Sequence, residues 1–88
     1  MDVTTIKVSA RSNVSSVAGA IAGGLREHGK IEIQVIGAGA LNQAMKAVII
    51  SRGFLAPEGI DIYCVPSFAE TQISGEDRTA IRLLIESR

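Results

Sequence analysis

The chain has 88 residues, of which 47% are hydrophobic and 20% are charged, so its composition excludes an intrinsically disordered chain. Nine basic residues balance nine acidic ones, which excludes binding to polyanions through bulk charge and leaves a local cluster as the electrostatic route to such a partner. We expect one domain over residues 1–88 and a cytoplasmic location, because no apolar signal segment opens the chain and no apolar run reaches the roughly 20 residues of a membrane span.

The first part of the chain predicts a strand followed by a helix. Apolar and polar residues alternate from Val3 to Ser9, which is typical of a half-buried strand. Asn13 or Ser12 then provides an N-cap, so we expect a helix from about Val14 to a left-handed cap at Gly29. Glycines inside a helix are destabilising, which predicts a close approach of this helix to the sheet or to another helix. Its predicted buried stripe consists of Val14, Val17, Ile21 and Leu25.

A second strand and a second helix follow. Residues 31–36 alternate cleanly and predict a strand that is parallel to the first, because a helix connects the two. Gly37 and Gly39 form the turn into the second helix, which we expect over residues 40–52 with Gly53 near its cap. The predicted buried stripe of this helix consists of Leu41, Ala44, Met45, Val48 and Ile49.

Apolar residues also occur outside this second stripe. Ile50 lies beside Lys46 on the helix, and Phe54 and Leu55 follow the expected cap. Because apolar side chains exposed together often mark an interface, Ile50, Phe54 and Leu55 are candidates for the contact between copies of the chain.

The last third of the chain predicts two strands joined by a hairpin. Residues 60–65 form a strand, and Pro66 places it at a sheet edge or causes a bulge. The chain stays extended to Ile73, turns over residues 74–77, and returns as a strand over residues 79–86. The order β-α-β-α-β-β predicts an α+β fold with two layers, in which both helices cover one face of a mixed four-stranded sheet.

The sequence gives little support to catalysis. The one histidine, His28, lies at the end of the first helix, where a positive charge favours the helix terminus. The one cysteine, Cys64, alternates with apolar residues in a strand and is expected to be a small buried side chain. No group of residues has the spacing of a zinc site. We therefore expect no enzymatic activity, no metal and no cofactor.

The glycine-rich turn matches a dinucleotide-binding motif only in part. Gly37 and Gly39 fit the pattern Gly-x-Gly-x-x-Gly, but Asn42 stands at the third glycine position. What remains is a helix N-terminus with free amides that glycines leave accessible. This turn is therefore either a plain tight turn or a site for a small anionic ligand.

Several segments resemble the stage V sporulation protein S (SpoVS) family, and they keep its order and spacing over nearly the whole chain. These segments are residues 7–12, 16–20, 36–44, 52–57 and 75–80. Proteins of this family are similar to Alba, a small nucleic-acid-binding fold with the same order of strands and helices. The resemblance implies an Alba-like fold, a homodimer or higher oligomer built largely on the second helix and its neighbours, and a role in regulating sporulation at the stage of spore-coat assembly.

Alba-type proteins contact nucleic acid with the loop after the first strand, the turn into the second helix and the last hairpin. By position these elements are residues 10–13, residues 37–43 and the arm around Ser74 and Gly75. This chain departs from its basic relatives, because glycines stand in the turn and Glu76 and Asp77 make the hairpin tip acidic. We therefore expect weak binding with a shallow dependence on salt. The candidate contacts are Arg11 and Lys46 to phosphates, Ser12, Asn13, Asn42 and Gln43 through hydrogen bonds, and Gly37 and Gly39 by close backbone approach.

Three functions remain open at this point. The first is a non-enzymatic regulator of sporulation that binds DNA or RNA as a homo-oligomer. The second is a protein–protein interaction module with an Alba-like fold that has lost nucleic-acid binding, as the few basic residues suggest. The third is a protein that binds a small ligand at the turn formed by Gly37 and Gly39.

Overall fold

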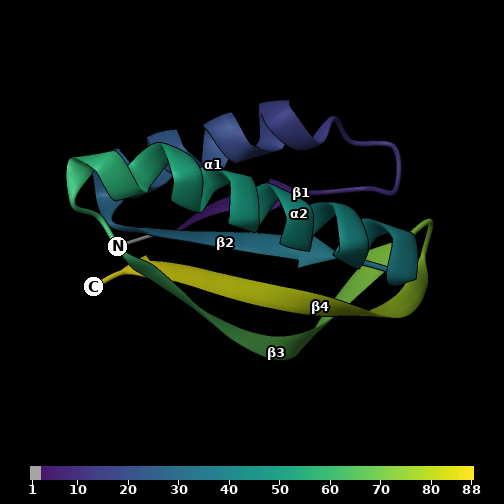
Figure 1. Ribbon diagram of the computed structural model, residues 1–88. Helices are drawn as coiled ribbons and strands as arrows, with labels where there is room; N and C mark the ends of the chain where they lie inside the picture. The colour runs from purple at the N-terminus through teal and green to yellow at the C-terminus, as the bar shows by residue number, and fades with distance from the viewer. Residues whose placement is uncertain (1–2) are drawn as a thin grey trace.

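Two helices pack on one face of a four-stranded sheet in the computed structural model, which describes residues 3–88 (Figure 1). The helices are α1 (Val14–His28) and α2 (Ala38–Leu55), and the one-turn 3-10 helix η1 (Ala56–Glu58) follows α2. The strands are β1 (Thr4–Lys7), β2 (Lys30–Val35), β3 (Ile62–Ile73) and β4 (Glu76–Ser87). The predicted α+β fold is thus confirmed, whereas residues 1 and 2 of the predicted domain lie outside the described residues. No helix within residues 3–88 is both long and apolar enough to cross a membrane.

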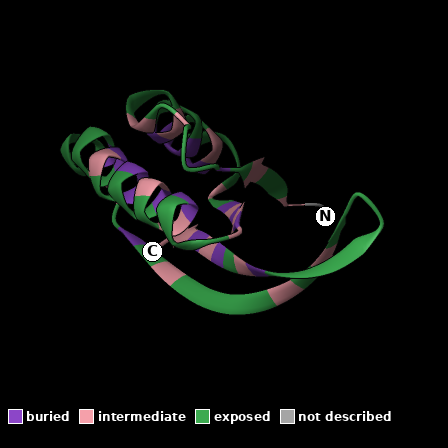
Figure 2. Ribbon diagram, turned by 90° about the vertical axis from the view of Figure 1, so that its right-hand side faces the viewer, coloured by how far each residue is buried: buried purple, intermediate pink, exposed green. Residues whose placement is uncertain are grey.

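The sheet has the order β1-β2-β4-β3, with β1 parallel to β2 and the other pairs antiparallel. β4 pairs with β2 only over residues 81–86, whereas it pairs with β3 along its whole length. Residues 69–80 therefore project past the end of β2 as a two-stranded extension, which we call the hairpin arm. The arm turns at Ser74 and Gly75, whose positive φ angles of 53° and 81° suit the twist of paired strands. Figure 2 shows the arm curving away from the helices.

The core lies between the helices and the sheet. Ile31 and Ile33 of β2 and Ile85 of β4 are fully buried, and the polar residues that alternate with them face the other side of the sheet. α1 lies so close to β2 that a Cβ atom at Gly24 would be 2.5 Å from Cγ2 of Ile31. This contact confirms the predicted close approach of the glycine-containing helix to the sheet.

Both ends of α1 are set by the residues that the sequence predicts. The side-chain oxygen of Asn13 accepts a hydrogen bond from the backbone N–H of Ser16 at 2.9 Å, which identifies Asn13 as the N-cap. Gly29 has a φ angle of 74°, and its N–H donates to the carbonyl oxygen of Leu25 at 2.9 Å. The predicted start and end of α1 are confirmed.

The predicted end of α2 is wrong. The helix continues through Gly53 to Leu55, because the left-handed cap lies further along, at Gly59 after η1. The helix also begins at Ala38, so that Gly39 lies in its first turn. Gly37 precedes the helix with a φ angle of 90°, which is a backbone conformation that only glycine adopts readily.

The predicted buried stripe of α2 is partly wrong as well. Ala44 and Val48 are buried as expected, but Met45 is 38% exposed and Ile49 is 66% exposed. The buried side of α2 is formed by small residues, which let the helix lie close to the rest of the core. Even its buried polar residue, Ser51, is satisfied, since its hydroxyl donates to the carbonyl oxygen of Val48 at 2.7 Å. The buried residues of α2 are Ala40, Ala44, Ala47, Val48, Ser51 and Leu55.

This rotation of α2 changes which apolar side chains are exposed. Leu55 is fully buried in the core, so the expectation that its side chain is exposed for contact with another copy is wrong. Ile50 is half-buried and packs against the core, whereas Phe54 is 45% exposed. The apolar residues that α2 exposes are therefore Met45, Ile49 and Phe54.

Candidate nucleic-acid interface

The fold brings the three elements of the predicted interface to one end of the molecule. The loop between β1 and α1, the start of α2 and the tip of the hairpin arm all lie at the end opposite to the chain termini (Figure 1). The reason is topological, because β1 and β2 are parallel and both end at this side, and β3 runs toward it before the hairpin turns.

The loop and the start of α2 touch each other. The Nε2 atom of Gln43 donates a hydrogen bond to the carbonyl oxygen of Ser12 at 3.1 Å. A Cβ atom at Gly39 would lie 3.0 Å from Cβ of Ala10, so the glycine lets the loop approach the helix closely. We call residues 10–13 together with residues 37–46 the loop–helix edge. Its backbone is held by contacts within the protomer.

Three of the predicted hydrogen-bonding side chains already bond within the protein. Ser12 accepts a hydrogen bond from the backbone N–H of Ser9 at 2.9 Å, and Asn13 caps α1. Gln43 holds the loop, as described above. Asn42 is exposed and forms no side-chain hydrogen bond within residues 3–88. The sequence predicts the cap, whereas the roles of Ser12 and Gln43 in shaping the loop depend on contacts that no sequence motif indicates.

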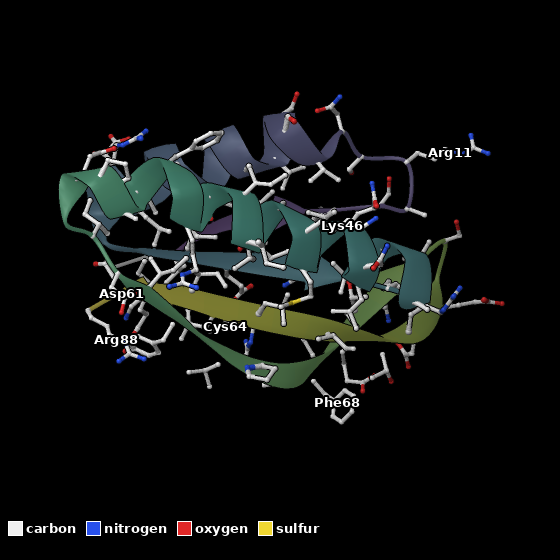
Figure 3. All side chains as sticks on the ribbon, in the orientation of Figure 1. Arg11, Lys46, Asp61, Cys64, Phe68 and Arg88 are labelled. Carbon is white, nitrogen blue, oxygen red and sulfur yellow. The ribbon has the colours of Figure 1, made fainter. Side chains whose placement is uncertain are left out.

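Arg11 and Lys46 are exposed, and neither forms an ion pair with the acidic side chains of residues 3–88. Figure 3 shows Arg11 pointing away from the loop, whereas Lys46 lies on the outer surface of α2, so the two do not meet within one protomer. Five other cations have acidic partners, and four of these ion pairs lie around the helix C-termini and chain ends, away from Arg11. The paired cations are Arg26, Lys30, Arg52, Arg82 and Arg88.

The tip of the hairpin arm is acidic, as the sequence predicts. Gln72 donates a hydrogen bond to Asp77 at 3.0 Å, and Thr79 donates to Glu70 at 3.1 Å. These hydrogen bonds hold the carboxylates in place but leave their charge. Arg78 is the one basic residue of the arm, and it is exposed and forms no ion pair within residues 3–88, so it offsets only part of this negative charge.

A hollow of about 240 Å³ lies between the loop and the hairpin arm. Its walls are residues 7–10 at the end of β1, residues 34–36 at the end of β2, and four residues of the arm. No sequence motif indicates this hollow, because it depends on how the arm lies against the ends of β1 and β2. None of its lining residues is acidic.

The ionisable groups with shifted pKa values lie away from this edge. A hydrogen bond from Arg26 lowers the pKa of Glu58, and the hydroxyl of Tyr63 together with Lys30 lowers the pKa of Glu86. The same hydrogen bond to Glu86 raises the pKa of Tyr63. These groups connect the ends of helices and strands, so their shifts indicate structural contacts. Within residues 3–88, no three His, Cys, Asp or Glu side chains are grouped as ligands for a metal ion.

An exposed apolar surface lies along β3, and α2 exposes further apolar side chains. Phe68 pairs with Ile81, whose side chain faces the helices, so Phe68 lies on the same face of the sheet. It is nevertheless 76% exposed, because the two helices do not cover this edge strand. The ion pair of Arg52 with Asp61 joins the C-terminal end of α2 to the residue just before β3. We call Met45, Ile49, Pro66, Phe68 and Ile81 the helix-side apolar surface.

The model of the family described as stage V sporulation protein S (SpoVS) matches residues 4–88. The match runs from the first residue of β1 to the last residue of the chain, so it includes the loop–helix edge and the hairpin arm. It confirms the resemblance that the sequence motifs indicate. The chain therefore belongs to the stage V sporulation protein S family, and this membership implies a role in sporulation.

Proposed function

We propose that this member of the sporulation family is a non-enzymatic regulator that binds nucleic acid as a homo-oligomer, with the loop–helix edge as its contact surface. The observation that carries the proposal is the exposure of Arg11 and Lys46 without an ion pair among residues 3–88. A cation whose charge is not neutralised within the protein is available to replace the counterions of a phosphate backbone. The β-α-β-α-β-β order supports the Alba-like part of the proposal. The proposed stage of action is spore-coat assembly, and the proposed location is the cytoplasm.

The fixed loop supports a positioning role for Arg11. Its backbone N–H donates to the hydroxyl of Ser9 at 3.2 Å, and the next residue, Ser12, is bonded to α2 through Gln43. The backbone that carries the guanidinium is thus ordered before any ligand binds, which lowers the entropic cost of binding. Arg11 and Lys46 provide two phosphate contacts at the loop–helix edge of one protomer, so a single protomer binds weakly through this edge.

Association of two copies would multiply these contacts. The helix-side apolar surface supports such a homo-oligomer, because Ile49 is 66% exposed and Phe68 is 76% exposed. Exposed apolar side chains of this size are typical of an interface between proteins. When one assembly carries the loop–helix edges of two protomers, binding of the first edge to a nucleic acid makes binding of the second edge intramolecular. The overall affinity then rises through avidity. The homodimer contact proposed here therefore lies on this surface, with Phe54 as a further candidate.

The proposal is tested by fluorescence anisotropy with labelled DNA and RNA probes at low salt. The double variant Arg11→Ala with Lys46→Ala is expected to bind at least about tenfold more weakly, since a dimer loses four phosphate contacts. The matched control is Arg26→Ala with Arg52→Ala, which removes two cations that have acidic partners. Equal affinity of the wild type and the first double variant contradicts the proposed contact surface.

A protein–protein interaction module is the second candidate function. The acidic tip of the hairpin arm and the balanced net charge favour it, because both disfavour phosphate. In this case the chain self-associates through the helix-side apolar surface but binds no nucleic acid at low salt. Light scattering together with the anisotropy experiment distinguishes the two candidates.

A further inference from the structure

We infer that the hollow between the loop and the hairpin arm holds one unpaired nucleotide, so that the chain binds single-stranded nucleic acid in preference to a duplex. This inference rests on the proposed function and names its substrate class. The hollow adjoins the loop–helix edge, because Ala10 forms part of its wall. At about 240 Å³ it is smaller than the roughly 300–1,000 Å³ of pockets for drug-sized ligands, which suits a single small planar group.

The walls of the hollow offer the chemistry that a nucleotide requires. Val8, Ile36 and Ile73 provide apolar surface for the faces of a base. Lys7 also lines the hollow and has no acidic partner within residues 3–88, so its ammonium group is available to a phosphate. Since no lining residue is acidic, nothing in the wall repels an anion.

One side-chain amide in the wall has a defined orientation. The Nε2 atom of Gln34 donates to Glu32 at 3.0 Å. The amide oxygen of Gln34 is left without a donor among residues 3–88 and can accept from the N–H groups of a base edge. Glu32 itself does not line the hollow.

The shape of the site selects an unpaired base. In a duplex each base is stacked on both faces and paired along its Watson–Crick edge, so it cannot enter a hollow in a protein wall without leaving the helix. In a single strand the base turns outward at little cost, and its neighbouring phosphate then lies near the loop that carries Arg11. Because no aromatic residue lines the hollow, the base packs on aliphatic side chains.

The inference is tested by filling the hollow. Thr71 is half-buried in the wall, and Thr71→Trp places a large side chain there at a strand position that favours aromatic residues. The control is Val65→Trp, on the same strand and the same face but outside the hollow, where Val65 is 49% exposed. Lys7→Ala is a second variant that keeps the shape of the strand. Circular dichroism and thermal unfolding establish that each variant folds.

Fluorescence anisotropy is measured with a single-stranded oligonucleotide and with the duplex of the same sequence. In a second experiment, adenosine monophosphate and uridine monophosphate are titrated into the protein while its backbone amides are observed by NMR. We expect the wild type to bind the single strand about tenfold more tightly than the duplex, which corresponds to about 1.4 kcal/mol of binding free energy. Thr71→Trp and Lys7→Ala are expected to remove this preference, whereas Val65→Trp retains it.

The outcomes separate this inference from the proposed function. If Thr71→Trp and Lys7→Ala bind the single strand as tightly as the wild type does, the hollow is not the site and the inference is wrong, although the proposed function stands. If the wild type binds neither probe, the proposed function is wrong. In that case the mononucleotide titrations still test the hollow. Chemical-shift changes at the backbone amides of Gln34 and Thr71 support a nucleotide site there, and the absence of such changes contradicts it.

Discussion

The packing of α1 on the sheet predicts opposite effects for two neighbouring glycines. Gly23 and Gly24 both lie inside α1, and alanine at either position raises the intrinsic helix stability by about 1 kcal/mol. A Cβ atom at Gly23 has no other atom within 4 Å, so Gly23→Ala is expected to stabilise the protein by about that amount. A Cβ atom at Gly24 meets Cγ2 of Ile31 at 2.5 Å.

The contact at Gly24 is costly because its partner cannot move aside. Ile31 is fully buried in β2, and a β-branched side chain has few alternative rotamers. Relieving the overlap requires a shift of α1 from the sheet, and such overpacking costs about 1–3 kcal/mol. Because the gain in helix propensity is the same at both positions, Gly24→Ala is expected to be less stable than Gly23→Ala by the cost of overpacking, about 2 kcal/mol.

Urea unfolding followed by circular dichroism measures this difference. With a slope of about 1 kcal/mol per molar urea, the two midpoints should differ by about 2 M. Gly19→Ala is a further control, because a Cβ atom at Gly19 also has no other atom within 4 Å. Equal midpoints for Gly23→Ala and Gly24→Ala would refute the close packing of α1 on β2.

Three further predictions concern the loop, the apolar surface and an ion pair. Asn13→Ala removes the N-cap of α1 and should lower the free energy of unfolding by about 1 kcal/mol, seen as a drop of about 5 °C in Tm. Met45→Glu with Ile49→Glu should reduce the molar mass measured by sedimentation, and an unchanged mass would exclude this surface as the interface. Arg26 lowers the folded-state pKa of Glu58, so this pair stabilises the fold above the ordinary carboxyl pKa and loses its effect as pH falls through the lowered value. Glu58→Gln should therefore unfold in urea with less dependence on pH between 3 and 7, and an unaltered pH profile would count against the pair.

The strands and the limits of α1 are predictable because local chemistry decides them. Alternation along residues 31–36 fixes which face of β2 is buried, since neighbouring side chains on a strand point in opposite directions. Asn13 and Gly29 act on the backbone within four residues of themselves, so their roles do not depend on distant parts of the chain. The parallel pairing of β1 with β2 follows from the helix between them.

The orientation of α2 could not be predicted from apolar spacing alone. Two stripes compete on this helix, and hydrophobicity favours the one with Met45 and Ile49. The fold instead buries the side with Ala47 and Ser51, because small residues allow a close approach of the helix to the core. The predicted end at Gly53 is wrong for a different reason. A glycine ends a helix as a cap only where its backbone is left-handed, and here Gly59 has that conformation while Gly53 does not.

The candidate site could be predicted in its parts but not in its arrangement. The resemblance places the loop with Arg11, the turn into α2 and the hairpin by position, and these elements do lie toward one end. Lys46 lies further along α2. The bond of Gln43 to the loop and the hollow beneath the arm depend on distances between segments far apart in the chain. Such contacts leave no local pattern in the sequence.

The dependence of binding on salt tests the proposed role of Arg11 and Lys46 most directly. For each phosphate that a protein neutralises, the slope of log affinity against log salt concentration changes by about 0.9 on duplex DNA and about 0.7 on single strands. Removing both cations should therefore reduce the slope on a single strand by about 1.4 for every protomer engaged. A slope that is the same in the wild type and in the double variant Arg11→Ala with Lys46→Ala would contradict the assignment of these cations to phosphate binding.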